Sequence, residues 1–185
     1  IAAKRWPDQW RNFRPLPYRF ASWVGYDMDG RTDIGWSTSL YYRMKEKAQK
    51  LAGYAKSLAD IGALPELAVR LDAAANHASE MADLLAIEPE NPVELSHVAN
   101  RISADHPAKL LSLAPIIDEL ETCANEADDE TARALLVLAC AMRADGLGMG
   151  WIHFRVNASQ LQNAIRRRID PDQKLDLASR GALLR

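Results

Sequence analysis

Three aspartates that could bind a metal ion or take part in catalysis follow an aromatic stretch near the amino end of the chain. Asp27, Asp29 and Asp33 lie within SWVGYDMDGRTD, residues 22–33, together with Gly30. Carboxylate oxygens are the ligands that hard divalent cations prefer in proteins. In a tight turn, however, Asp side chains bond to nearby backbone amides and glycine supplies a positive φ. The residue types leave a metal site, a catalytic loop and a turn between a strand and a helix open.

The best-known carboxylate loop, the EF-hand, does not fit this stretch. Its calcium loop needs oxygen ligands at positions 1, 3, 5 and 12 and glycine at position 6. With Gly30 at position 6, Gly25 and Trp36 fall at positions 1 and 12, and neither has a side-chain oxygen. A different metal site built on the same three aspartates remains as an alternative. No other metal-binding motif is found in the sequence, so we expect no metal ligands in this segment.

A second polar group stands near the end of MGWIHFRV, residues 149–156, where His153 and Arg155 alternate with apolar residues. A planar guanidinium suits bidentate binding of a phosphate group. The alternative role for Arg155 is an ion pair with a carboxylate such as Asp27 or Asp29. Both roles place this arginine at the end of a predicted strand.

The first stretch resembles the Ser-Trp-aliphatic-Gly-Gly-Asp-Arg-Asp-Gly-Asn-Pro signature of phosphoenolpyruvate carboxylases. In this chain the signature reads Ser22, Trp23, Val24, Gly25, Tyr26, Asp27, Met28, Asp29, Gly30, Arg31, Thr32. In that family a later strand ends in Asp-aliphatic-Arg-Gln-Glu-Ser, and the matching place here reads IHFRVNA, residues 152–158. The resemblance spans about residues 18–168 and is specific in the first motif.

The resemblance implies an excised part of an α/β barrel that carries two consecutive strands and the helices between them. The intact family converts phosphoenolpyruvate and bicarbonate to oxaloacetate and phosphate, a carbon-fixing lyase reaction that uses Mg²⁺ or Mn²⁺. The ligands of that metal would lie outside this segment. By the same resemblance Arg155 would contact the substrate phosphate. The active-site loop would contain Gly25, Asp27, Asp29, Gly30 and Arg31.

Several residues depart from the family pattern. Met28 replaces an arginine, Tyr26 replaces a second glycine, and His153 replaces an aspartate. The family's histidine, carboxylate and late glycine-rich motifs are also missing from these 185 residues. We therefore expect the segment to be inactive alone, with the rest of a parent chain as its partner. The alternative is a non-enzymatic helical interaction or regulatory module derived from the family.

The elements that must position these residues are mostly helical. Apolar residues recur at intervals of three and four from Leu40 to Leu58, with Ser37 and Thr38 as N-cap candidates and Gly62 after the pattern, which predicts an amphipathic helix. Similar patterns predict further helices over 65–87, 92–102, 107–126, 131–144 and 158–169. Strands are predicted over 18–26 and 149–156.

Two features qualify these helices. Pro115 is expected to kink the helix over 107–126, because an interior proline removes a backbone hydrogen bond. The acidic run over 126–130 precedes the helix over 131–144, where negative charge suits the amino end of a helix dipole. The five tryptophans are expected to anchor the core.

Composition limits the function classes. Lys plus Arg (23) nearly balances Asp plus Glu (25), so we expect no nucleic-acid partner, and the longest apolar run is too short for a membrane span. The two cysteines lack CxxC spacing and indicate reduced thiols in a cytoplasmic protein. We expect a mostly α fold, a helical bundle with two short strands. Its parts are a lead-in (1–17), a domain (18–170) and a charged tail (171–185), and exposed apolar helix faces would favour homo-oligomers.

Overall fold

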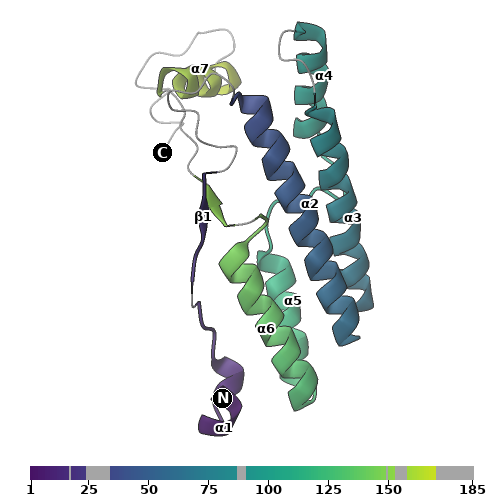
Figure 1. Cartoon of the computed structure of the whole chain (residues 1–185), viewed down its shortest axis with the longest axis vertical. Helices are drawn as coiled ribbons and strands as arrows, with labels where there is room; N and C mark the ends of the chain where they lie inside the picture. Colours follow the sequence, from purple (N-terminus) through teal and green to yellow (C-terminus); the bar gives the residue numbers. More distant parts are fainter. Residues whose placement is uncertain (17, 24–33, 87–90, 149, 153–157, 170–185) are drawn as a thin grey trace. The chain divides into compact units, whose positions relative to one another are not determined.

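The computed structural model describes residues 1–16, 18–23, 34–86, 91–148, 150–152 and 158–169. The described part is mostly helical, with two short parallel strands, as the sequence predicted (Figure 1). The elements in chain order are α1 (Ala2–Arg5), η1 (Trp10–Asn12), β1 (Ala21–Ser22), α2 (Trp36–Ile61), α3 (Pro65–Leu84), α4 (Pro92–Ser103), α5 (Ala114–Glu126), α6 (Asp129–Asp145), β2 (Trp151–Ile152) and α7 (Ala158–Ile169).

Helices α2 and α3 form an antiparallel hairpin (Figure 1). Leu51 and Leu58 of α2 and Leu71 of α3 are fully buried between them. Gly62 ends α2 in the left-handed conformation, with φ of 76°, which glycine adopts without a side-chain clash. The predicted helix is therefore confirmed, but its N-cap is Gly35; the serine at 37, expected to cap, is buried instead.

Helix α5 corrects the expectation for Pro115. The structure has no helix over 107–113; α5 begins at Ala114, so Pro115 lies in the first turn. Amide groups in the first turn of a helix have no partner within the helix, and proline therefore costs no backbone hydrogen bond there. The residue that was expected to kink a helix marks its start.

Helix α6 packs antiparallel to α5 and begins as the acidic run predicted. The Asp128 carboxylate accepts hydrogen bonds from the amides of Glu130 and Thr131, at 2.9 and 3.0 Å, and these bonds lower its pKa. The buried side of α6 carries small and long apolar residues, among them Leu135, Ala139 and Met142. One hydrophobic core thus joins α6 to α2, α3 and α5.

The lead-in, expected to be irregular, contains the short helical turns α1 and η1. Trp10 of η1 is buried in the core cluster. Arg11 Nη2 donates to Ala127 O at 3.0 Å and forms an ion pair with Asp129 Oδ1 at 2.8 Å, while Arg14 forms an ion pair with Glu121. Contacts with α5 and α6 order this segment, and such contacts have no local sequence pattern.

The other tryptophans correct the expectation that all five anchor the core. Trp6, Trp23, Trp36 and Trp151 are more than two-fifths exposed, and only Trp10 is buried. Contacts further divide the chain into two compact units, Ile1–Ile152 and His153–Arg185. No helix in the described ranges has the length and apolar character needed to cross a membrane.

Candidate functional site

The residues that the sequence singled out as an active-site loop lie outside the described residues. This applies to Gly25, Asp27, Asp29, Gly30 and Arg31, and equally to Arg155. Their predicted roles, and the alternative ion pair between Arg155 and an aspartate, remain predictions. The structure does describe the residues that come directly before both groups along the chain.

Strands β1 and β2 bring those preceding residues together. They pair in parallel, with Ala21 opposite Trp151 and Ser22 opposite Ile152 (Figure 1). Because the strands run in the same direction, their carboxyl ends lie at the same edge of the pair. Among the described residues the pairing is shorter than predicted, since residues 18–20 and 23 are not in a strand.

The glycines after α6 allow the chain to reach this pairing. Gly150 has φ of 103°, and a β-carbon there would lie 2.5 Å from the carbonyl oxygen of Phe20. The next amide, that of Trp151, donates to the same oxygen at 2.7 Å. Only glycine fits this close approach of two backbones without displacement. Nothing in the sequence indicated this role, because it depends on a backbone segment far away along the chain.

Arg43 of α2 is a second residue that the sequence analysis missed. Its Nη1 atom lies 3.4 Å from Gly150 O and 3.3 Å from Glu46 Oε2, and a β-carbon at Gly148 would lie 2.1 Å from the same nitrogen. Arg43 and Gly150 are 107 residues apart. No local signal in the sequence could have paired them.

A cavity of about 260 Å³ lies beside Arg43, next to β2, and Arg143 of α6 also lines it. Both guanidinium groups are already paired with carboxylates. Arg43 contacts Glu46, and Arg143 Nη2 lies 2.8 Å from Glu121 Oε1. The positive charges that line this cavity are therefore balanced by carboxylates. The cavity is not an open site for an anion.

Two side chains of α2, those of Tyr54 and Lys47, have shifted pKa values. Tyr54 donates its hydroxyl to Gly146 O at 3.0 Å, and burial, followed by the nearby Asp145 carboxylate, raises the pKa of Tyr54 far above its usual value. Burial also lowers the pKa of Lys47, with further contributions from Lys109 and Arg43. Tyr54 thus remains a donor that fixes the turn after α6.

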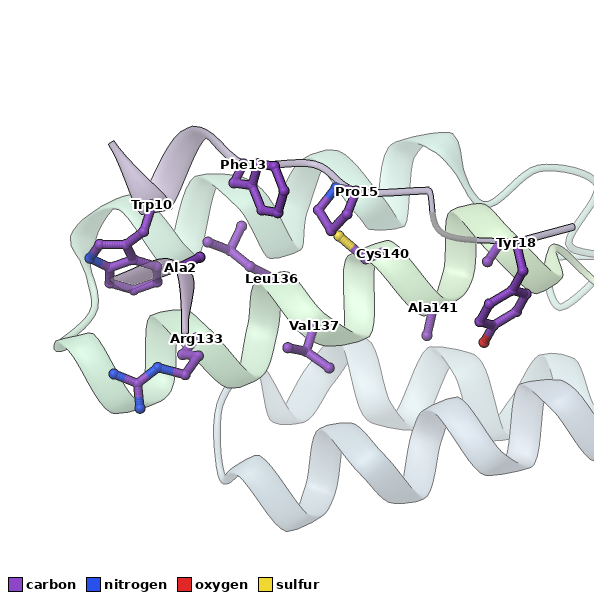
Figure 2. A pocket seen from close by; sticks show the side chains of 11 residues that line it. Ala2, Trp10, Phe13, Pro15, Tyr18, Arg133, Leu136, Val137, Cys140 and Ala141 are labelled. Carbon is purple, nitrogen blue, oxygen red and sulfur yellow. The ribbon is translucent and has the colours of Figure 1, made fainter. Parts of the chain in front are cut away.

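An apolar cavity of about 330 Å³ lies between the lead-in and α6, and we call it the α6 pocket. Figure 2 shows the lead-in residues over one side of α6. The walls of the α6 pocket include Trp10, Phe13, Pro15, Leu136, Val137 and Cys140. Arg133 and Tyr18 lie at its two ends (Figure 2).

Within the ranges that the structure describes, no group of three or more His, Cys, Asp or Glu side chains is arranged to hold a metal ion. The aspartates on which the alternative metal site depends lie outside those ranges. Cys123 and Cys140 are both free thiols. Comparisons of this chain with protein-family models, with curated proteins and with solved structures gave no match.

Proposed function

We propose that this chain is a segment of a divergent phosphoenolpyruvate carboxylase-like protein. The observation that supports it most directly is the parallel pairing of β1 with β2. Ser22 and Ile152, which pair with each other, are the first residues of the two stretches that resemble the family's motifs. In barrel enzymes, catalytic residues follow the carboxyl ends of parallel strands.

The exposure of the strand pair also supports a longer parent protein. Parallel sheets are normally covered on both faces, and an isolated strand pair is marginally stable. Here Phe20, Trp23 and Trp151, next to or within the strands, are 60%, 52% and 56% exposed. Additional strands and a covering layer from the rest of a parent chain would bury these aromatic side chains, so the parent chain is the partner that we propose.

In the parent protein, Arg155 would bind the phosphate of phosphoenolpyruvate, since a guanidinium can donate two parallel hydrogen bonds to phosphate oxygens. Asp27 and Asp29 would position the loop around Gly25, Gly30 and Arg31. The divalent metal of the family would stabilise the enolate. The described residues include no metal ligand set, so we assign none here. The segment alone is expected to be inactive, because the family's histidine, carboxylate and late glycine-rich motifs are missing from its sequence.

The departures from the family signature favour a second candidate. Loss of an arginine at Met28 removes a positive charge from the anion site, and His153 replaces an aspartate. A helical interaction or regulatory module derived from the family would tolerate both changes. For either candidate we propose a cytoplasmic location, which fits two free thiols.

The test is oxaloacetate formation by the intact parent protein, with phosphoenolpyruvate, bicarbonate and Mg²⁺. Arg155→Ala should reduce kcat/KM by a factor of about 100 or more, because the phosphate loses a charge-assisted contact. Arg101→Ala, at an exposed position on α4, is the matched control and should keep full activity. A well-folded parent without activity would exclude the enzyme and favour the helical module.

A further inference from the structure

The α6 pocket has one wall that is fixed by polar contacts outside the pocket. Arg11 binds Ala127 O and Asp129 where α5 joins α6, and Arg14 pairs with Glu121 of α5. In the sequence, Phe13 lies between the two arginines and Pro15 follows the second one. The polar contacts of the arginines therefore hold Phe13 and Pro15 over α6 (Figure 2). The pocket is therefore formed before any ligand arrives, which reduces the entropy lost on binding.

The positive charge at one end of the α6 pocket is available for a ligand. The Arg133 guanidinium lies 5.8 Å from the ring centroid of Trp10, and Arg133 forms no salt bridge with any residue in the described ranges. Arg11, on the same tryptophan at 5.1 Å, is instead paired with Asp129. Of these two arginines, Arg133 is the one whose charge lacks a carboxylate.

The rest of the α6 pocket is apolar and elongated. It follows α6 from Arg133 to Ala144, which is about 16 Å at a rise of 1.5 Å per residue. Burial raises the pKa of the Cys140 thiol, so this side chain stays neutral near pH 7. A volume of about 330 Å³ is in the range of small-molecule sites, which combine apolar walls with a few polar groups.

We propose that the α6 pocket binds an amphipathic carboxylate with an unbranched alkyl chain, its carboxylate on Arg133 and its chain along α6 toward Tyr18. The guanidinium selects an anionic head group because it donates charge-assisted hydrogen bonds to a carboxylate. The long apolar groove selects a chain rather than a compact polar body. This site does not depend on the carboxylase relationship, because none of the residues that line it belongs to the two stretches that resemble the family's motifs.

The first test is titration calorimetry of residues 1–185 with sodium decanoate below its micellar concentration. We expect one saturable site, about tenfold weaker binding in Arg133→Gln, and no binding in Val137→Trp, whose indole would fill the groove. Val137 is 65% exposed, so this change leaves the core intact. The matched controls are Val69→Trp, at a valine that is 68% exposed on α3, and Lys56→Gln on α2; both should bind normally.

A second readout leaves the residues that line the α6 pocket unchanged. In a Cys123→Ala background, alkylation of Cys140 by a maleimide should slow as decanoate is added and should follow the same saturation curve. Decyltrimethylammonium, a cation with the same chain, should protect far less. Absence of saturable binding would overturn the proposal. Equal decanoate binding by the wild type and Val137→Trp, or equal protection by the two amphiphiles, would also overturn it.

Discussion

His77 of α3 and His106, in the segment between α4 and α5, stack with ring centroids 4.5 Å apart and an interplanar angle of 20°. His106 Nδ1 accepts a hydrogen bond from the amide of Ala108 at 3.2 Å. Lys47 Nζ of α2 donates to Leu110 O at 2.5 Å, and the positive charges of Lys47 and Lys109 both act on His77. A neutral imidazole suits His77 here, because an added proton would meet these positive charges.

The pKa of His77 is lowered first by burial and then by His106, Lys47 and Lys109, with Glu80 acting in the opposite direction. The unfolded chain therefore takes up this proton at a higher pH than the folded chain does. Stability should be fully present above about pH 6.5 and should fall as the pH drops through the folded pKa.

We expect His77→Gln to weaken this pH dependence by less than about 1 kcal/mol, because solvent screens a partly exposed group. The measurement is urea unfolding between pH 7.5 and pH 5, with His97→Gln, exposed on α4, as the control. An unchanged pH dependence in His77→Gln would show that the stacked pair does not control acid stability.

At the scale of elements, the run from Gly146 to Gly150 decides whether β2 can reach β1. Gly146, with φ of 68°, ends α6, and Gly150, with φ of 103°, approaches the Phe20 carbonyl. Gly148 faces the movable end of the Arg43 side chain instead of backbone atoms. The glycines therefore differ in how much a methyl group would cost, although all look alike in the sequence.

Gly150→Ala should lower the free energy of unfolding by about 2–3 kcal/mol, because it combines a strained φ with a clash against backbone. Gly148→Ala should cost much less, since the Arg43 guanidinium can rotate away. Gly53→Ala is the contrasting control and should stabilise by up to about 1 kcal/mol, because Gly53 lies exposed in the interior of α2 with open space around it. Chemical denaturation measures the free energy of unfolding of all three variants. Equal stability of the Gly150→Ala and Gly148→Ala variants would contradict the predicted order.

At the scale of the molecule, the hydrophobic core lies entirely within the unit Ile1–Ile152. The cluster extends from Trp10 through Leu51 and Leu71 to Met142. The strands β1 and β2 belong to the same unit, and residues 153–185 form a separate compact unit. Since a continuous core gives cooperative unfolding, the first unit should behave as one domain.

A chain ending after Ile152 should therefore keep a single cooperative thermal transition, followed by circular dichroism, with a Tm close to that of residues 1–185. A chain ending after Asp145 is the comparison. It lacks the Gly146 carbonyl that accepts from Tyr54 and the Trp151 amide that donates to Phe20, so its Tm should be several degrees lower. A broad, non-cooperative transition in the longer truncation would show that residues 153–185 are needed for the fold.

The sequence by itself determined the helices α2, α3, α4 and α6, because the spacing of apolar residues, Gly62, and the acidic start of α6 act within a few residues. It also placed two strands on either side of a long helical crossover. Pro115 was misjudged because its effect depends on where α5 begins, and most tryptophans were misplaced because burial depends on distant neighbours. Only the tertiary structure decided the pairing of β1 with β2, the contact of Arg43 with Gly150 and the α6 pocket. These features join residues about 100 or more positions apart, and contacts at such separations have no periodic pattern in the sequence.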